Sequence, residues 1–227
     1  MGFPRREALP VASGKAGGIP RRGEPRGGRS NGAPGTCHLG CAADRRSLGI
    51  VFDRVKHASL AERMREDPTA IPQYLRTLAA LQARIHAQPA SQFSGLKLRL
   101  ATNIARVNVL DEPRKRVLLT RLADMPEGDR LCHGDFHPIN VLGEVSWPFV
   151  IDWPDACRGD PAADLCRSYL LLRLHAADIA EPYLDAYCRI SNVTWEKVLD
   201  WLPCVAAARL AEDIPDECDR LREMASA

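Results

Sequence analysis

The segment formed by residues 131–152, LCHGDFHPINVLGEVSWPFVID, constrains the fold of this 227-residue chain more than any other stretch. It begins with a polar loop and continues with two short apolar runs, residues 141–142 and 149–151. Gly, Ser and Pro lie between the two runs, and these residue types favour turns. The pattern therefore predicts a β-hairpin that has a polar loop at its open end.

The expected register of this hairpin gathers polar side chains. If Val141 pairs with Ile151 in an antiparallel ladder, Asn140 lies opposite Asp152. Both residues then lie beside the loop that holds Asp135, so that three oxygen-bearing side chains share one small volume. Carboxylate and amide oxygens are ligands for hard divalent cations, which in turn bind phosphates. The segment thus favours phosphoryl transfer as the chemistry of this chain.

Apolar residues elsewhere recur at three- to four-residue spacing, which predicts a mostly helical body. Asp160 followed by Pro161 is a strong helix start, because Asp caps free N–H groups and Pro suits the first turn. Pro203 is expected to kink or divide its helix, and His86 to complement the dipole of its helix or cap its last carbonyls. A strand is expected over residues 49–55. The expected helices span residues 59–66, 71–87, 96–107, 113–122, 160–174, 181–190, 194–210 and 213–225.

Residues 1–47 differ in composition from the rest of the chain. They hold ten Gly and five Pro, nine Lys/Arg against three Asp/Glu, and no helical or strand periodicity. Such a segment cannot bury enough surface to offset its ordering entropy, so a disordered tail is expected. Residues 48–227 form the expected folded domain and carry a net charge of −4. A mildly acidic body argues against a specific nucleic-acid partner.

Hydropathy and cysteine usage indicate the cellular compartment in which the protein is expected. No apolar stretch approaches the ~20 residues that span a bilayer, and the N-terminus lacks the apolar region of a signal peptide. The eight cysteines are scattered without a CxxC pair, which is typical of reduced thiols. We therefore expect a cytoplasmic protein with no membrane partner, whose oligomeric state the sequence leaves open.

Three blocks, HGDFHPINVL, VIDW and RGDPAADLCR, occur in this order in the sequence. Together they resemble the aminoglycoside phosphotransferase and choline kinase group, which are relatives of the protein kinases. The group has a catalytic loop with the pattern His-x-Asp, four residues, Asn, then a metal-binding Asp, then a GDPxxDL run. The matching residues here are His133, Asp135, Asn140, Asp152, Asp160 and Asp164.

The resemblance covers residues 48–227 and corresponds to a carboxy-terminal lobe. It implies an α+β, protein-kinase-like fold, present mainly as the helical carboxy-terminal lobe with an embedded β-hairpin. It also implies an ATP-dependent phosphotransferase that acts on a hydroxyl of a small molecule such as an aminoglycoside or an amino-alcohol.

The same resemblance implies a role for each matching residue. Asp135 is expected to act as general base on the acceptor hydroxyl, and Asn140 and Asp152 to hold Mg²⁺ against the phosphates of ATP. In a simpler interpretation, Asp135 accepts backbone N–H bonds and Asn140 is a turn residue. The residues expected to have structural roles are His133, which packs the loop, Asp160, which caps a helix, and Asp164, which braces the loop.

A complete member of this group also has an amino-terminal lobe, in which a strand Lys and a helix Glu grip the nucleotide. Lys15, the one Lys before Lys56, lies among glycines, so no nucleotide-clamping Lys is assigned. We therefore expect this lobe to be absent or degenerate. A wrong reading frame or a mis-called start would also produce the abrupt change near residue 48. The alternative function is a non-catalytic, truncated kinase-like remnant that binds a metal, a ligand or a partner without transferring phosphate.

Overall fold

The computed structural model describes residues 40–44, 47–51 and 55–226 of the chain. The chain divides into two units, Met1–Lys56 and His57–Ala227. In the first unit, strands β1 (Gly40–Asp44) and β2 (Ser47–Val51) form an antiparallel pair.

Strand β1 lies inside the segment that was expected to be disordered, and β2 overlaps the expected strand at residues 49–55. The rest of the disordered-tail prediction, residues 1–39, lies outside the described residues. The expected absence of an amino-terminal lobe falls largely on the same undescribed part of the chain.

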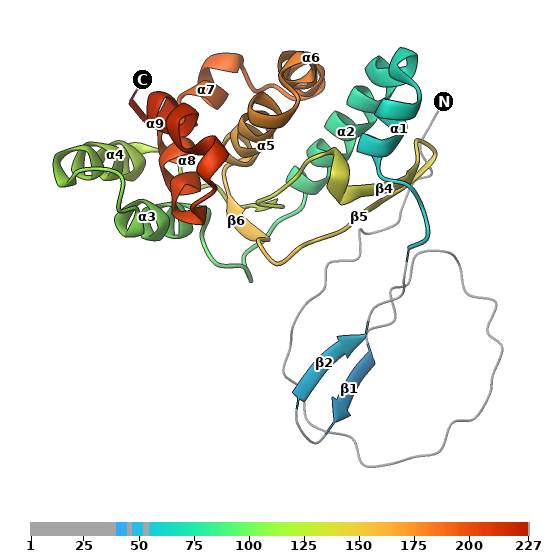
Figure 1. The fold of residues 1–227 in the computed structure, drawn as a ribbon, viewed down its shortest axis with the longest axis horizontal. Helices are drawn as coiled ribbons and strands as arrows, with labels where there is room; N and C mark the ends of the chain where they lie inside the picture. The colour runs from blue at the N-terminus through green and yellow to red at the C-terminus, as the bar shows by residue number, and fades with distance from the viewer. Residues whose placement is uncertain (1–39, 45–46, 52–54, 227) are drawn as a thin grey trace. The chain divides into compact units, whose positions relative to one another are not determined.

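The second unit is mostly helical with two small sheets, which confirms the α+β expectation (Figure 1). Its strands, each pair antiparallel, are β3 (Arg130–Cys132) with β6 (Cys157–Gly159), and β4 (Val141–Glu144) with β5 (Trp147–Val150). Its α-helices are α1 (Leu60–Glu66), α2 (Ile71–His86), α3 (Leu96–Arg106), α4 (Glu112–Asp124), α5 (Pro161–His175), α6 (Ala177–Cys188), α7 (Trp195–Leu199), α8 (Leu202–Arg209) and α9 (Cys218–Ser226).

Local capping chemistry sets several of these boundaries. The Ser59 side chain and Glu62 form a reciprocal capping box that starts α1. The Asp160 side chain accepts a hydrogen bond from Ala162 N at 2.7 Å and starts α5. The expected helix at residues 194–210 is divided into α7 and α8, and Pro203 lies in the first turn of α8, where its missing N–H costs nothing.

The core of the second unit lies between its helices. Helix α2 packs against α6, α5 packs against α6 and α8, and α8 also packs against α3 and α9. Strand β3 packs against both α2 and α5, so these two helices support the start of the loop that follows β3. The largest fully buried side chains include Trp201, Tyr183, Tyr187, Phe136, Leu78, Ile85, Leu131, Leu165 and Leu170.

The predicted register of the central hairpin is wrong by one residue. Val141 pairs with Val150, and Glu144 pairs with Trp147 across a two-residue turn at positions 145 and 146. The expected register required a three-residue turn, and loop length fixes register in a hairpin. Asn140 therefore faces Ile151, whose N–H donates to the Asn140 carbonyl at 3.0 Å, and Asp152 lies one residue further along.

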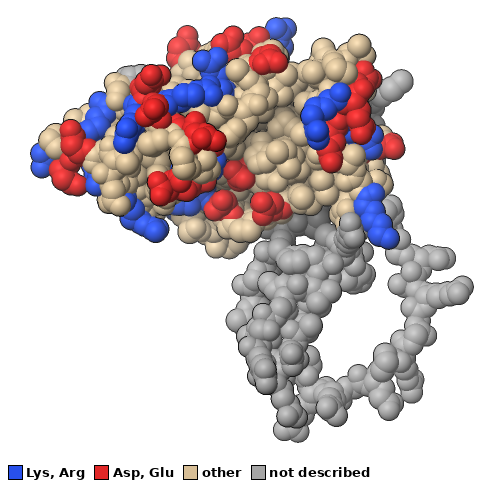
Figure 2. Space-filling view, viewed as in Figure 1, with Lys and Arg blue, Asp and Glu red and all other residues tan. Residues whose placement is uncertain are grey.

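The surface of the second unit carries both signs of charge. On the face shown in Figure 2, acidic and basic side chains are interspersed, with apolar and neutral residues between them. Among the described helices, none is both long and apolar enough to cross a bilayer.

Candidate active site

The loop after β3, residues 133–140, carries the candidate site. The chain leaves β3 at Cys132 and turns through Gly134, which has a φ of +85°. A Cβ atom at this position would overlap the carbonyl oxygen of Asp155 and lie 2.6 Å from the guanidinium of Arg99. Glycine is therefore required here, because only a residue without a side chain lets this loop lie so close to the segment that follows Asp152.

The Asp135 side chain is held from two sides. Asn140 Nδ2 donates to the main-chain oxygen of Asp135 at 2.9 Å and lies 3.4 Å from its carboxylate Oδ2. Nε2 of His137 lies 3.3 Å from the same Oδ2, and Nη2 of Arg167 lies 3.3 Å from Oδ1. The loop itself and helix α5 thus fix one orientation of the carboxylate.

Opposing effects act on the pKa of Asp135. Burial raises the pKa, but the hydrogen bond from His137 and the positive charge of Arg167 lower it more, so the pKa lies well below the ordinary aspartate value. The carboxylate is therefore ionised at neutral pH. It can accept a hydrogen bond from a hydroxyl group and orient that group.

Asn140 and Asp152 each offer an oxygen that protein groups do not use. The bonds of the Asn140 side chain run through Nδ2, and no described residue donates to its Oδ1. Asp152 is exposed, and no described residue forms a hydrogen bond or ion pair with its carboxylate. The hydrogen bond between Ile151 N and the Asn140 carbonyl pairs Asn140 with Ile151, and Asp152 is the next residue along the chain at the open end of the hairpin. One amide oxygen and one carboxylate form a donor set that suits Mg²⁺.

Asp152 also has an unusual backbone conformation. Its φ of +64° lies in the left-handed region, which non-glycine residues seldom adopt. Asp tolerates this region better than most residues, at a cost of order 1–3 kcal/mol. Strained positions of this kind cluster at functional sites, which is consistent with a special role for Asp152.

His133 connects the two parts of the site. Its Nε2 donates to the carbonyl of Ile151 at 2.9 Å, and its Nδ1 accepts from Asp135 N at 3.3 Å. Burial lowers the pKa of this imidazole, so the ring stays neutral and can keep both roles. The ring also packs against Trp153, with centroids 4.6 Å apart. The Asp135 loop and the end of β5 are thereby joined by one side chain.

Asp164 supports the same loop from α5. Its carboxylate accepts from Gly134 N at 2.6 Å and from His133 N at 3.2 Å. Burial raises the pKa of Asp164, but the hydrogen bond from His86 and other donors lower it to about 2. Asp160, by contrast, bonds through its carboxylate only to Ala162 N among the described residues, so it acts within its own helix.

Two residues near the site were missed or misplaced by sequence reasoning. Arg167 lies three residues after Asp164, one helical turn further on α5, and this spacing is the signal that could have placed it on the same face. Its Nη2 also donates to Glu212 at 2.8 Å. His86 does not cap its own helix; it is buried and bonds to Asp164 and Tyr187.

Comparison with known proteins bears on this arrangement. A family model described as "Phosphotransferase enzyme family" matches residues 37–201. Among curated proteins, none matches the sequence significantly.

Solved structures show the same fold. A thermostable mutant of the aminoglycoside phosphotransferase APH(4)-Ia superposes with a TM-score of 0.63 at 18% identity, covering 84% of this chain and 75% of that one. Choline kinase LicA from Streptococcus pneumoniae gives a TM-score of 0.60 at 17% identity, covering 83% and 75%. An amicoumacin kinase gives 0.56 at 14% identity, covering 82% and 66%. At these identities the likeness concerns the fold, which is that of small-molecule kinases.

Proposed function

The chain belongs to the phosphotransferase enzyme family, and from this premise we propose that it transfers the γ-phosphate of ATP to a hydroxyl group of a small molecule. One observation carries the proposal. The Asp135 carboxylate is held in a fixed orientation, while Asn140 Oδ1 and the Asp152 carboxylate, both at the open end of the hairpin, have no protein partner among the described residues. Free oxygen ligands beside an oriented base are what phosphoryl transfer requires.

Asp135 acts as the general base in this proposal. Phosphoryl transfer passes through a loose transition state, so positioning of the acceptor hydroxyl contributes more than early removal of its proton. A carboxylate with a lowered pKa, held by Arg167 and His137, is suited to orienting the hydroxyl and receiving its proton late.

Asn140 and Asp152 hold Mg²⁺ in this proposal. When bound, the ion would neutralise charge on the phosphates of ATP. The amide oxygen of Asn140 can serve as a ligand because Nδ2 makes all the bonds of this side chain inside the loop. Asp152 is exposed and ionisable, so it can reach a cation that arrives from solvent with its nucleotide.

The acceptor is proposed as a hydroxylated small molecule. One structure that shares the fold is a choline kinase, and another, with a TM-score of 0.50, is the phosphotransferase APH(4)-Ia in a ternary complex with AMP-PNP and hygromycin B. These acceptors define the chemical class to test first. The free thiols of the described cysteines fit a reducing compartment, the cytoplasm, where ATP is plentiful.

Calorimetric titration with AMP-PNP tests nucleotide binding by this chain. We expect an affinity on the order of micromolar with Mg²⁺, and at least tenfold weaker binding without it or in Asp152→Asn. Asp160→Asn is the matched control, since it removes an acidic charge from the same region without touching the oxygen ligands. Binding that is absent, or indifferent to Mg²⁺ and to Asp152, would favour the alternative of a remnant that binds ligand or partner without transfer.

A further inference from the structure

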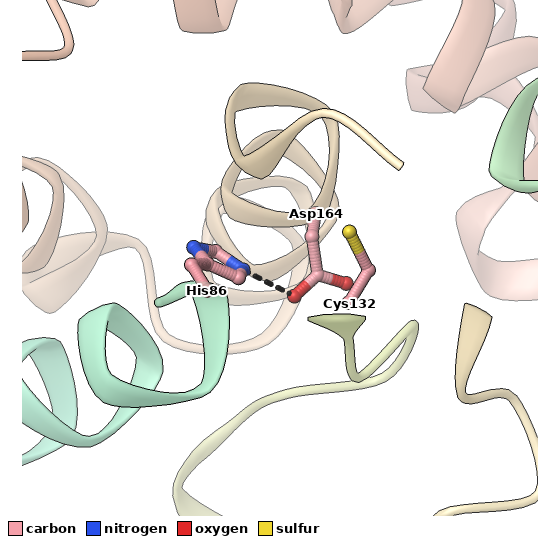
Figure 3. A group of neighbouring side chains, drawn as sticks. All are labelled: His86, Cys132 and Asp164. Carbon is pink, nitrogen blue, oxygen red and sulfur yellow. Dashed lines mark hydrogen bonds and ion pairs between the residues drawn. The ribbon is translucent and has the colours of Figure 1, made fainter. Parts of the chain in front are cut away.

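A cluster of buried polar side chains adjoins the loop of the candidate site and takes no part in the chemistry proposed above. Three helices contribute to it, α2, α5 and α6. It comprises Gln82, His86, Asp164, Ser168, Tyr183 and Tyr187, all buried. We refer to these six residues as the buried polar cluster. Figure 3 shows His86 from α2 directed at Asp164 of α5, with Cys132 at the end of β3 beside them.

The first question is whether this place is a metal site. His86, Cys132 and Asp164 each offer a ligand atom, and these atoms lie within 4.8 Å of one another. However, the Asp164 carboxylate already accepts four N–H groups. The donors are Gly134 N at 2.6 Å, His86 Nε2 at 2.9 Å, Gln82 Nε2 at 3.1 Å and His133 N at 3.2 Å. Three of these donors reach Oδ2, the oxygen that faces His86, so a cation bound between His86 and Asp164 would have to break bonds that are already made.

The proton positions follow from the charge of Asp164. Because this carboxylate is ionised, it can only accept, so Nε2 of His86 carries the proton that it donates to Asp164. The hydroxyl of Tyr187 lies 2.6 Å from Nδ1 of His86 and shares a hydrogen bond with it. Burial raises the pKa of Tyr187, which keeps its hydroxyl protonated. A chain of hydrogen bonds thus connects Tyr187, His86 and Asp164.

These hydrogen bonds end at the backbone of the loop that carries Asp135, residues 133–140. Oδ1 of Asp164 accepts from Gly134 N, and Oδ2 accepts from His133 N as well as from His86. Gly134 precedes Asp135 directly, so the orientation of the Asp164 carboxylate determines where the backbone of Asp135 lies. The carboxylate can turn about its terminal bond, a broad and soft torsion, unless its oxygens are held. From the helix side, His86 and Gln82 hold Oδ2.

We propose that His86 is a positioning residue for phosphoryl transfer: its Nε2–H fixes the Asp164 carboxylate, which holds the loop N–H groups that place Asp135. The proposal rests on the proposed function, and it assigns a task to a histidine that touches no reacting atom. Removing a side chain that orients a functional residue through a hydrogen bond typically lowers affinity or activity by about ten- to a hundredfold. We expect an effect of that size on turnover.

Three substitutions separate positioning from packing. His86→Leu removes the N–H donor, whereas His86→Gln places an amide N–H where it can reach Asp164. Thr77→Val is the matched control, because Thr77 is a buried residue on the same helix whose hydroxyl bonds only to Gln73 O of that helix among the described residues. Two readouts are compared: kcat and KM for ATP, and hydrogen exchange of the amides of His133 and Gly134.

We expect His86→Leu to lower kcat by about ten- to a hundredfold with KM for ATP changed less than about threefold. Exchange at the His133 and Gly134 amides should rise in the same variant, while exchange in α8 stays unchanged. His86→Gln should recover most of both losses, and Thr77→Val should show neither. Equal loss of kcat in the Leu and Gln variants, or unchanged exchange at both amides in the Leu variant, overturns the proposal.

Two further outcomes are decisive. If purified wild-type protein contains about one zinc ion per chain, and His86→Gln loses it, the cluster is a metal site and the proposal is wrong. If the wild type transfers no phosphate at all, the proposed function fails, but the exchange comparison still decides whether His86 positions the loop.

Should His86→Leu not fold, Tyr187→Phe is the replacement test, because it removes the hydroxyl that bonds to His86 Nδ1 and keeps the ring. We expect it to raise exchange at the two amides to a smaller extent. Exchange left at the wild-type level in Tyr187→Phe overturns the proposal.

Discussion

Replacing Asp164 by Asn tests how strongly the loop is held by its buried support. The substitution keeps the size of the side chain but removes its charge. Three of the four N–H groups that Asp164 binds reach Oδ2 and one reaches Oδ1, so at least one buried donor faces the NH₂ group of Asn, whichever way the amide is turned. Leaving one buried donor unsatisfied costs about 1–3 kcal/mol.

The lowered pKa of Asp164 provides a second way to gauge this loss. The pKa lies at about 2 in the folded chain, against an ordinary value of 3.8. A difference of this size corresponds to about 2 kcal/mol of stabilisation of the charged form by the folded protein. Both routes therefore predict that Asp164→Asn loses about 2 kcal/mol of the free energy of unfolding.

Urea unfolding followed by far-ultraviolet circular dichroism measures this loss through linear extrapolation. Asp160→Asn is the matched control: it makes the same chemical change four residues earlier, at the N-cap of α5, where Asn caps about as well as Asp and should cost less than about 0.5 kcal/mol. If Asp164→Asn were as stable as Asp160→Asn, the reasoning that the carboxylate supports the loop would be refuted.

Three further predictions concern stability in urea unfolding. Burial holds the pKa of His133 below its ordinary value of 6.5, so as the pH falls the imidazole takes up a proton in the unfolded chain before it does so in the folded chain. The free energy of unfolding should therefore fall as the pH drops below about 6.5. An equal pH dependence in His133→Asn would contradict this. Gly134→Ala should cost more than about 1 kcal/mol, since φ is +85° and the new Cβ meets backbone; Gly95→Ala, whose Cβ meets only Arg158 at 3.9 Å, should cost less, and equal losses would refute the argument. Ser59→Ala should cost about 1 kcal/mol through loss of the capping box, and an unchanged midpoint would contradict it.

Sequence reasoning succeeded where the signal is local. The helix starts at Ser59 and Asp160 were predicted because each depends on a cap and on residues within three positions of it. The division of residues 194–210 was predicted because a proline in a helix interior removes a backbone hydrogen bond and tends to kink or break the helix. The loop motif around Asp135 was readable for the same reason, since its members lie within a few residues of one another.

Sequence reasoning failed where the signal is non-local. The hairpin register depended on whether the turn has two or three residues, and the turn sequence at positions 145 and 146 carries no Asn-Gly or Asp-Gly signature to decide it. Strands β3 and β6 were not predicted, because three-residue strands are too short to show alternation. His86 was assigned to its own helix end, since nothing near it in the sequence reveals that Asp164, on another helix, lies 2.9 Å away.

Transfer of phosphate to an acceptor tests the central claim most directly. Purified chain is incubated with ATP labelled at the γ-phosphate, Mg²⁺ and hydroxylated amines such as choline and hygromycin B, and phosphorylated acceptor is identified by mass spectrometry. We predict a phosphorylated product with the wild type, and turnover lowered by about two to four orders of magnitude in Asp135→Asn, with nucleotide binding retained. A wild type that binds Mg-nucleotide but phosphorylates no acceptor, or an Asp135→Asn variant that turns over at the wild-type rate, would contradict the claim.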